Sequence, residues 1–200
     1  MSYSKKIRYS VDSSKKKVRF KGALLETTIC AAVALVLAFL ITTFALQLTH
    51  VGGSSMYPTL SNSDYILVEK ISYRFEEPER FDVIVFPYVE ESGEIRNYIK
   101  RVIGLPGETI QIKDGIIYIN GEVISEDFGF ETINTGGWAE NPVEIGMDEY
   151  FVLGDNRNNS KDSRHLDEYG SSDIGLIEKE KIIGKAWLRI YPLGKIGKVQ

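Results

Sequence analysis

The sequence predicts a mainly β domain that follows one N-terminal transmembrane helix. A basic segment precedes a long apolar run near the start of the chain, which is the pattern of a membrane anchor. Short β-branched and aromatic runs then alternate with turn-forming residues, and little helical periodicity follows residue 60. With 200 residues, 43% of them hydrophobic, the chain has room for an anchor and one modest domain with a core.

Charge divides the chain into a basic start and an acidic remainder. Residues 1–22 hold eight lysines and arginines and one aspartate, whereas residues 50–200 hold 16 basic and 26 acidic residues. Basic residues before an apolar run favour the cytoplasmic side of a membrane, so we expect a cytoplasmic tail and an extracytoplasmic C-terminal domain. A basic tail can also bind nucleic acid, but the adjoining apolar run favours lipid headgroups as its partner.

The apolar run at residues 23–48 is predicted to be an uncleaved anchor. Its only charged residue is Glu26, and Thr27–Leu48 provides 22 residues, enough to cross a hydrocarbon core of roughly 30 Å. A cleavable secretory signal is the alternative, but its apolar part is about 7–15 residues long and ends at a small-x-small site, which Leu46–His50 lacks. Because the single cysteine, Cys30, lies in this run, a disulfide framework and a cysteine metal site are excluded.

Strands are expected where β-branched and aromatic residues cluster between turns. An Asp-Gly step at residues 114–115 predicts a hairpin, and Asn120-Gly121 predicts a second turn close behind it. The expected strands are Tyr65–Val68, Asp82–Phe86, Ile110–Ile112, Ile116–Ile119, Tyr150–Leu153 and Ala186–Tyr191.

A serine cluster lies just beyond the anchor, in the segment Gly53–Leu60 (GSSMYPTL). Pro58 fixes its own φ and disfavours the α conformation at Tyr57, so the segment is extended or turned. Gly53 leaves neighbouring backbone N–H groups accessible to a ligand. A nucleophilic serine needs this combination of an exposed hydroxyl and nearby amide donors. The alternative is a polar linker that ends the membrane helix.

Lys100 lies in a strand-like run of largely apolar residues. Its side chain points to the face opposite Ile99 and Arg101. If that face is buried, desolvation lowers the pKa of the lysine and makes it a usable general base. The alternative is an edge-strand lysine that discourages aggregation.

A third segment, Gly154–Arg164 (GDNRNNSKDSR), combines turn formers with charges. This composition predicts a loop of side-chain-to-backbone bonds and ion pairs. A calcium loop is an alternative, but its aspartates lack the alternating spacing of an EF-hand. A Ser–His–Asp site needs a supported histidine, and neither His50 nor His165 has obvious support, so a lysine base remains the option for a catalytic serine.

Together the three segments resemble the motifs of the bacterial type I signal peptidases. Ser55–Leu60 is similar to the nucleophile motif of that family, and Tyr98–Gly107 is similar to its general-base motif. Gly154–Arg164 resembles the C-terminal motif, and Ile183–Ala186 resembles the strand after it. The resemblance covers roughly residues 25–192, with the motifs in the family's order and spacing.

The resemblance implies a role for each motif residue. Ser55 would be the nucleophile, Lys100 the neutral base, and Ser160 a hydrogen-bond partner that orients Lys100. In some branches of the family, a serine hydroxyl two positions before the nucleophile is the second donor to the oxyanion. This chain has Gly53 at that position, as Gram-positive-type members do. The second oxyanion donor beside the Ser55 N–H would therefore be the Gly53 backbone, a water, or absent. The expected ion-pair scaffold consists of Asp155, Arg157, Asp162 and Arg164. No metal or cofactor is implied.

The fold implied by the resemblance is an antiparallel β catalytic core with a small β-rich insertion. The peptidase domain would span residues 49–200, with the insertion at about 112–148 as a reduced cap. The segment 165–173 departs from the family's usual turn, which puts the loop geometry there in question.

The activity implied is removal of N-terminal signal peptides from secreted preproteins through an acyl-enzyme. The partners would be preproteins with small residues at positions −1 and −3 of the cleavage site and the lipid bilayer, without nucleic acid. Two other classes stay open. A self-cleaving repressor-type protease shares the Ser–Lys pair but is soluble and carries a DNA-binding module, and a non-catalytic relative would lack Ser55 or Lys100.

Overall fold

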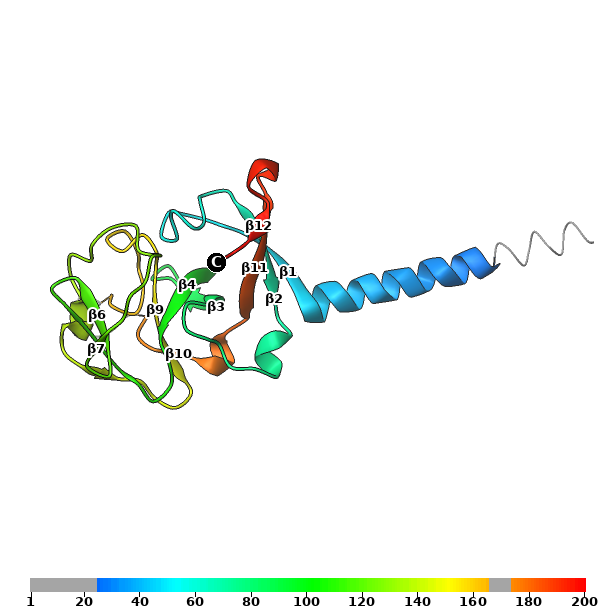
Figure 1. Ribbon diagram of the computed structural model, residues 1–200. Coiled ribbons are helices and arrows are strands. Elements are labelled where there is room, and N and C mark those ends of the chain that lie inside the picture. Colours follow the sequence, from blue (N-terminus) through cyan, green and yellow to red (C-terminus); the bar gives the residue numbers. More distant parts are fainter. Residues whose placement is uncertain (1–24, 166–173) are drawn as a thin grey trace, which may run out of the picture. The chain divides into compact units, whose positions relative to one another are not determined.

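The computed structural model describes residues 25–165 and 174–200 (Figure 1). The predicted basic tail at 1–22, the start of the predicted anchor and the segment 166–173 lie outside the described residues. The chain divides between Phe44 and Ala45 into two compact units. The first contains an apolar helix and the second a β domain.

The helix, Leu25–Ala45, is long and apolar enough to cross a membrane by length and composition. It closes with the π-helical turn η1 (Ile41–Ala45). The predicted anchor extended to residue 48, but strand β1 (Leu46–His50) already begins at Leu46. Leucine alternates with Gln47 and Thr49 there, and this period of two suits a strand that pairs with β2 (Tyr65–Glu69).

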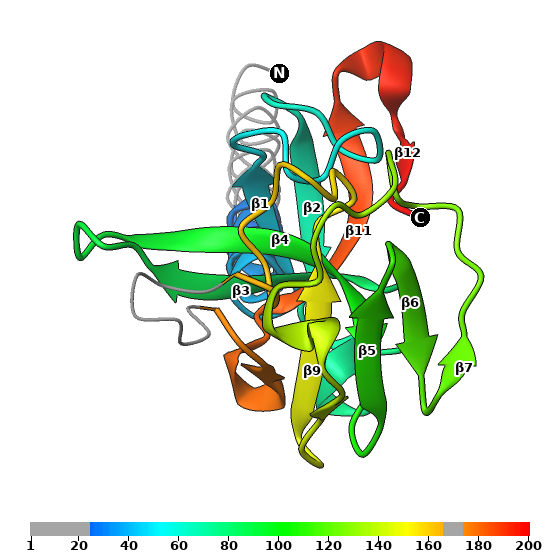
Figure 2. The same cartoon turned by 90° about the vertical axis from the view of Figure 1, so that its left-hand side faces the viewer.

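The larger sheet is antiparallel and follows the order β1-β2-β11-β3-β4-β9-β10, with β12 paired to β11 (Figure 2). This confirms the predicted fold class, and each strand predicted in this sheet is present. The remaining strands of this sheet are β3 (Val83–Val89), β4 (Ile95–Gly104), β9 (Glu149–Leu153), β10 (Ile177–Glu178), β11 (Gly184–Tyr191) and β12 (Gly197–Lys198).

A second, four-stranded sheet follows the order β7-β6-β5-β8. Its turns fall at the two predicted dipeptides, where Asp114, Gly115, Asn120 and Gly121 all have positive φ, as tight hairpin turns require. We call residues 109–144 the cap. Its strands are β5 (Thr109–Lys113), β6 (Ile116–Ile119), β7 (Glu122–Val123) and β8 (Val143–Glu144).

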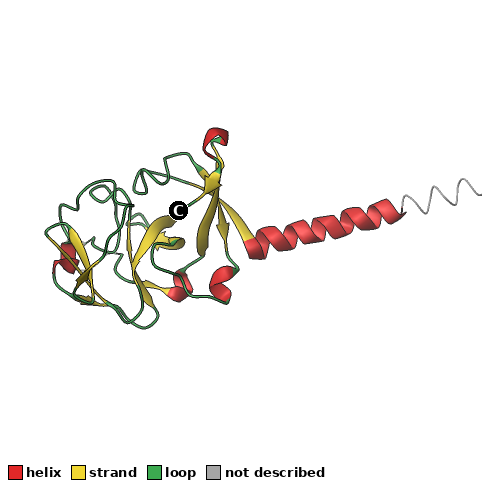
Figure 3. Ribbon diagram, viewed as in Figure 1, coloured by secondary structure: helices red, strands yellow, loops and turns green. Residues whose placement is uncertain are grey.

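The described part of the β domain contains only short 3-10 helices, in agreement with the weak helical periodicity of its sequence (Figure 3). They connect strands and contribute few buried side chains. Their bounds are η2 (Ser72–Arg74), η3 (Gly137–Glu140), η4 (Lys179–Lys181) and η5 (Leu193–Lys195).

The core fixes the serine segment to the larger sheet. Met56 and Leu60 are 2% and 1% exposed and pack in one cluster with Ile99 of β4. Burying a side chain of this size contributes about 1.5–3 kcal/mol. Ser55 is therefore held directly beside β4, the strand that carries Lys100.

Candidate active site

The serine segment is a turn, as Pro58 and Gly53 predicted. The Tyr57 N–H donates to the Ser54 carbonyl at 3.1 Å, and the Leu60 N–H donates to the Met56 carbonyl at 2.8 Å. Gly53 has a φ of 84°, a conformation that glycine adopts without strain. The segment is thus a folded part of the β domain.

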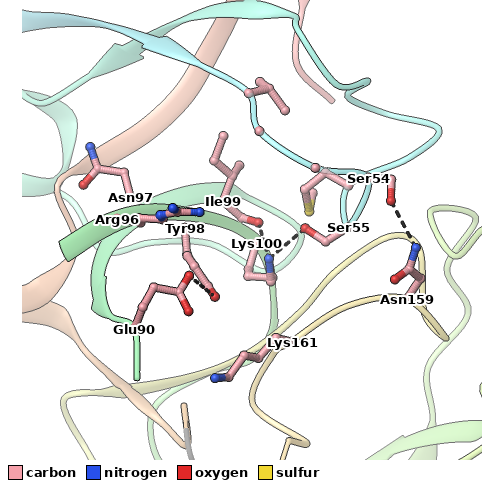
Figure 4. Close-up of a pocket in the computed structure, with 14 residues that line it drawn as sticks. Ser54, Ser55, Glu90, Arg96, Asn97, Tyr98, Ile99, Lys100, Asn159 and Lys161 are labelled. Atoms are coloured by element: carbon pink, nitrogen blue, oxygen red, sulfur yellow. Dashed lines mark hydrogen bonds between the residues drawn. The ribbon is translucent and has the colours of Figure 1, made fainter. Parts of the chain in front are cut away.

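Lys100 reaches Ser55 across the groove between the turn and β4 (Figure 4). Its Nζ lies 2.9 Å from Ser55 Oγ and also donates to the Ile99 carbonyl at 2.9 Å. The residue is only 3% exposed, so it is not the solvent-exposed lysine that would discourage aggregation at a strand edge. Two segments separated by more than forty residues therefore bring a hydroxyl and an amine into hydrogen-bond contact.

Burial lowers the pKa of the Lys100 amine from its usual 10.5 to about 8. Asp162 and Asp155 act in the opposite direction, because a negative charge nearby stabilises the ammonium form. Desolvation outweighs both carboxylates. A substantial fraction of Lys100 is therefore neutral, and able to accept a proton, at mildly alkaline pH.

The Gly154–Arg164 loop contacts the serine turn through backbone and amide groups. The Asn156 N–H donates to the Ser55 carbonyl at 3.0 Å, and its Nδ2 donates to the Ser54 carbonyl at 3.1 Å. Asn159 Nδ2 donates to Ser54 Oγ at 3.1 Å. This loop fixes the backbone of the serine turn and leaves Ser55 Oγ to Lys100.

The four residues of the predicted ion-pair scaffold are buried, but only Asp162 and Arg164 pair with each other, at 2.8 Å. Asp155 receives two bonds from Arg101, at 2.8 and 2.7 Å, and both side chains are fully buried. Arg157 pairs with Glu126 of the cap at 2.6 Å.

Sequence reasoning therefore missed Arg101 and Glu126. An arginine inside an apolar strand run was a usable signal for a buried ion pair, because an arginine is almost never fully buried without a partner. Glu126 carries no comparable signal, since it lies among turn-forming residues with several other carboxylates.

The hydrogen bond expected between Ser160 and Lys100 is absent. Ser160 Oγ is buried and has no partner among the described residues. The hydroxyl packs instead against Gly154, where an added Cβ would lie 2.2 Å from it, and the Lys100 amine bonds Ser55 and Ile99.

The predicted backbone donor at Gly53 is already engaged, because its N–H donates to Asn62 Oδ1 at 3.0 Å. The Ser55 N–H has no hydrogen-bond partner within the described part of the chain, so it is available to an oxyanion. Of the two histidines, His50 packs against the Tyr65 ring and His165 lines a separate cavity, so neither belongs to the groove at Ser55.

The groove has a volume of about 450 Å³. Its lining combines apolar side chains, among them Val51, Met56 and Ile99, with polar ones, among them Glu90, Tyr98 and Lys161. Among residues 25–165 and 174–200, no group of three histidine, cysteine or acidic side chains has a metal-binding arrangement.

A buried lysine in contact with a serine hydroxyl, on a β domain and beside a free backbone N–H, is the arrangement of a serine-type hydrolase with a lysine base. Comparison with known proteins agrees with this class. The sequence model of the family described as "Signal peptidase, peptidase S26" matches residues 24–191, and the chain belongs to this family.

Similar curated proteins come from cyanobacteria and bacilli. The chain is 35% identical to "Probable signal peptidase I-2" of a Synechocystis strain, over 92% of this chain and 81% of that protein. It is 34% identical to "Signal peptidase I" of Bacillus amyloliquefaciens, over 94% of this chain and 99% of that protein. "Signal peptidase I S" of Bacillus subtilis is 34% identical, over 89% and 95%. The chain is accordingly a serine-type endopeptidase that removes signal peptides from preproteins.

Proposed function

We propose that Ser55 is the nucleophile and Lys100 the general base of this signal peptidase. The observation that carries the proposal is the 2.9 Å contact between Lys100 Nζ and Ser55 Oγ. The lowered pKa of Lys100 supports it, because a permanently charged amine cannot accept a proton.

The reaction proceeds through an acyl-enzyme. Ser55 Oγ attacks the scissile carbonyl carbon while neutral Lys100 takes the hydroxyl proton, and the Ser55 N–H stabilises the oxyanion. The ammonium of Lys100 then protonates the leaving amine, which frees the mature protein. Lys100 next takes a proton from water, the hydroxide attacks the ester, and the signal peptide leaves as Ser55 recovers its proton.

The supporting residues hold this pair without touching the substrate. Arg101 neutralises Asp155, and Arg164 neutralises Asp162, so both carboxylates next to Lys100 are compensated. This limits how far they raise the pKa of the base. Arg157 and Ser160 belong to the same loop and contribute to its packing.

The substrate is a preprotein with small residues at positions −1 and −3. Strand β4 pairs with β3 over Ile95–Arg101 but with β9 only from Arg101 onward, so its Ile95–Lys100 edge lacks a partner strand among the described residues. An extended peptide can add to that edge, with backbone bonds supplying affinity and the groove selecting alternate side chains.

The enzyme acts at a membrane, with its basic tail in the cytoplasm and its β domain outside. The apolar helix and the charge of residues 1–22 support this orientation. Lipid is the partner of the helix, and confinement of enzyme and membrane-tethered substrate to one plane raises their effective concentration.

The test of substrate choice is cleavage of one preprotein by the purified full-length chain in detergent. We expect cleavage after a small residue at −1, identified by sequencing the new N-terminus. Replacing that residue by phenylalanine should lower kcat/KM by at least about 10². Equal cleavage of both preproteins would contradict the proposed specificity.

A further inference from the structure

A partly buried carboxylate in the cap, Glu126, pairs with Arg157 of the Gly154–Arg164 loop. Its Oε1 lies 2.6 Å from Arg157 Nη1, with the side chains 11% and 2% exposed. Its Oε2 accepts the N–H groups of Phe128 and Gly129 at 3.0 and 3.2 Å. Both carboxylate oxygens are therefore engaged, which fixes the geometry that Glu126 presents to Arg157.

Arg157 passes this constraint to the backbone beside Ser55. Its Nε donates to the Gly154 carbonyl at 3.1 Å. Gly154 packs so closely on the serine turn that an added Cβ would lie 2.5 Å from the Ser55 carbonyl oxygen. A movement of the Arg157 guanidinium thus changes the position of a residue in direct contact with Ser55.

The neighbouring cap residues contact the same loop. The Phe130 N–H donates to the Asp155 carbonyl at 2.8 Å. The Phe128 ring lies 3.7 Å from the Arg101 guanidinium carbon, and Arg101 pairs with Asp155 and follows Lys100 in β4. Residues 126–130 therefore contact the loop that packs on Ser55, and they also contact Arg101, the residue after Lys100.

We propose that Glu126 is a positioning residue for the signal peptidase reaction and acts through Arg157 on the backbone at Gly154 and Ser55. The proposal rests on the proposed roles of Ser55 and Lys100. It makes residues 126–130 of the cap part of the support of the proposed catalytic pair.

Removal of the Glu126 carboxylate has two possible effects on the pKa of Lys100, and they are opposite in sign. Loss of the Glu126 charge leaves the positive charge of Arg157 uncompensated, and electrostatics alone then lowers the pKa of Lys100. Release of the loop admits water to Lys100 and raises its pKa. The groups that face this amine are Ser55, the Tyr98 ring at 5.0 Å, Asp155 and Asp162, and none of them is altered by the substitution.

The experiment compares wild type, Ser55→Ala, Glu126→Gln and Glu131→Gln as full-length chains in detergent, cleaving one preprotein across a pH series. Glu131 is the matched control, because it is an exposed carboxylate five residues further along. For Glu126→Gln we expect kcat to fall about tenfold or more while KM changes by less than about twofold, since misplaced catalytic groups slow the chemical step. The alkaline midpoint of kcat should move to higher pH, and Glu131→Gln should match wild type.

A second variant keeps the proposal falsifiable if Glu126→Gln does not fold. Gly129→Ala places a methyl group 3.2 Å from the Arg157 guanidinium carbon and removes no charge, so we expect a smaller fall in kcat in the same direction. Wild-type kcat in folded Glu126→Gln, a midpoint that stays or falls, or wild-type kcat in Gly129→Ala overturns the proposal. Cleavage by Ser55→Ala would instead overturn the proposed function itself.

Discussion

At Lys100, burial sets the protonation state and packing sets the direction of the amine. The residue is 3% exposed, and two carboxylates nearby oppose the loss of its charge. The cost of burying an ammonium exceeds the benefit of those carboxylates, so the pKa falls to about 8. The proposed role of Lys100 as a base therefore depends on keeping water away from its amine.

The activity of the wild-type enzyme should rise with pH on a single limb with its midpoint near the Lys100 pKa of about 8. The neutral amine is the active form, so activity is lost as the pH falls below that value. Lys100→Arg should be inactive at every pH, because a guanidinium stays protonated. Initial rates of preprotein cleavage from about pH 6 to about pH 10, a range that includes the pKa of Lys100, measure both results. Near wild-type turnover by Lys100→Arg would rule out the lysine base.

Lys100→Met should stabilise the fold at neutral pH. With a folded pKa near 8 and an unfolded value near 10.5, wild type carries the full cost of a buried charge below pH 8 and loses that cost as the pH rises to 10.5. At 1.36 kcal/mol for each pKa unit the difference is about 3 kcal/mol. Denaturant unfolding of both proteins at neutral and alkaline pH measures it. A stability difference that does not shrink at alkaline pH would contradict the buried-lysine account.

At the scale of elements, turn chemistry and strand composition predicted most of the β domain. Asp114-Gly115 and Asn120-Gly121 marked both cap hairpins, and the predicted strands are present. Strand β1 was absorbed into the predicted anchor, because Leu46 and Leu48 continue the apolar run and only pairing with β2 separates them from it.

Close approach between segments was beyond sequence reasoning. The Glu126–Arg157 and Arg101–Asp155 pairs join residues 31 and 54 positions apart, and no local pattern fixes such partners. The Ser160 hydroxyl was expected at Lys100 by resemblance, whereas its actual contact with Gly154 depends on the path of the loop. Ser55 and Lys100 could be singled out from the sequence because each lies in a motif that is contiguous in the chain.

Gly154→Ala should lower kcat sharply. A Cβ at this position would lie 2.2 Å from Ser160 Oγ and 2.5 Å from the Ser55 carbonyl oxygen, and this backbone oxygen cannot move aside without shifting Ser55, the proposed nucleophile. A misplacement of a reacting group by about 1 Å can cost about 10² in rate. Gly194→Ala is the matched control, because nothing lies within 4 Å of its added Cβ. Equal kcat for both variants would show that the Gly154 contact does not position Ser55.

For the whole molecule, the two units have separate tasks. The apolar helix is long and apolar enough to serve as a membrane anchor, and the β domain contains every residue of the proposed site. Charge and hydropathy predicted this division from sequence, since a single long apolar run stands between a basic and an acidic segment.

The orientation is open to direct measurement. We expect protease added to intact protoplasts to degrade the β domain, because basic residues before an apolar run favour the cytoplasmic side and the proposed orientation therefore puts the β domain outside. Immunoblots with antibodies against the β domain follow the digestion, and a cytoplasmic protein serves as the control for intact membranes. Protection of the β domain in protoplasts, with digestion after lysis, would contradict the proposed topology.

The central claim is that Ser55 alone forms the bond to the substrate. Its most direct test is preprotein cleavage by purified Ser55→Ala and Ser54→Ala, since the two serines are adjacent but only Ser55 Oγ contacts Lys100, while Ser54 Oγ accepts a bond from Asn159. We expect Ser55→Ala to be inactive and Ser54→Ala to keep substantial activity. Cleavage by Ser55→Ala, or loss of cleavage in Ser54→Ala alone, would contradict the account.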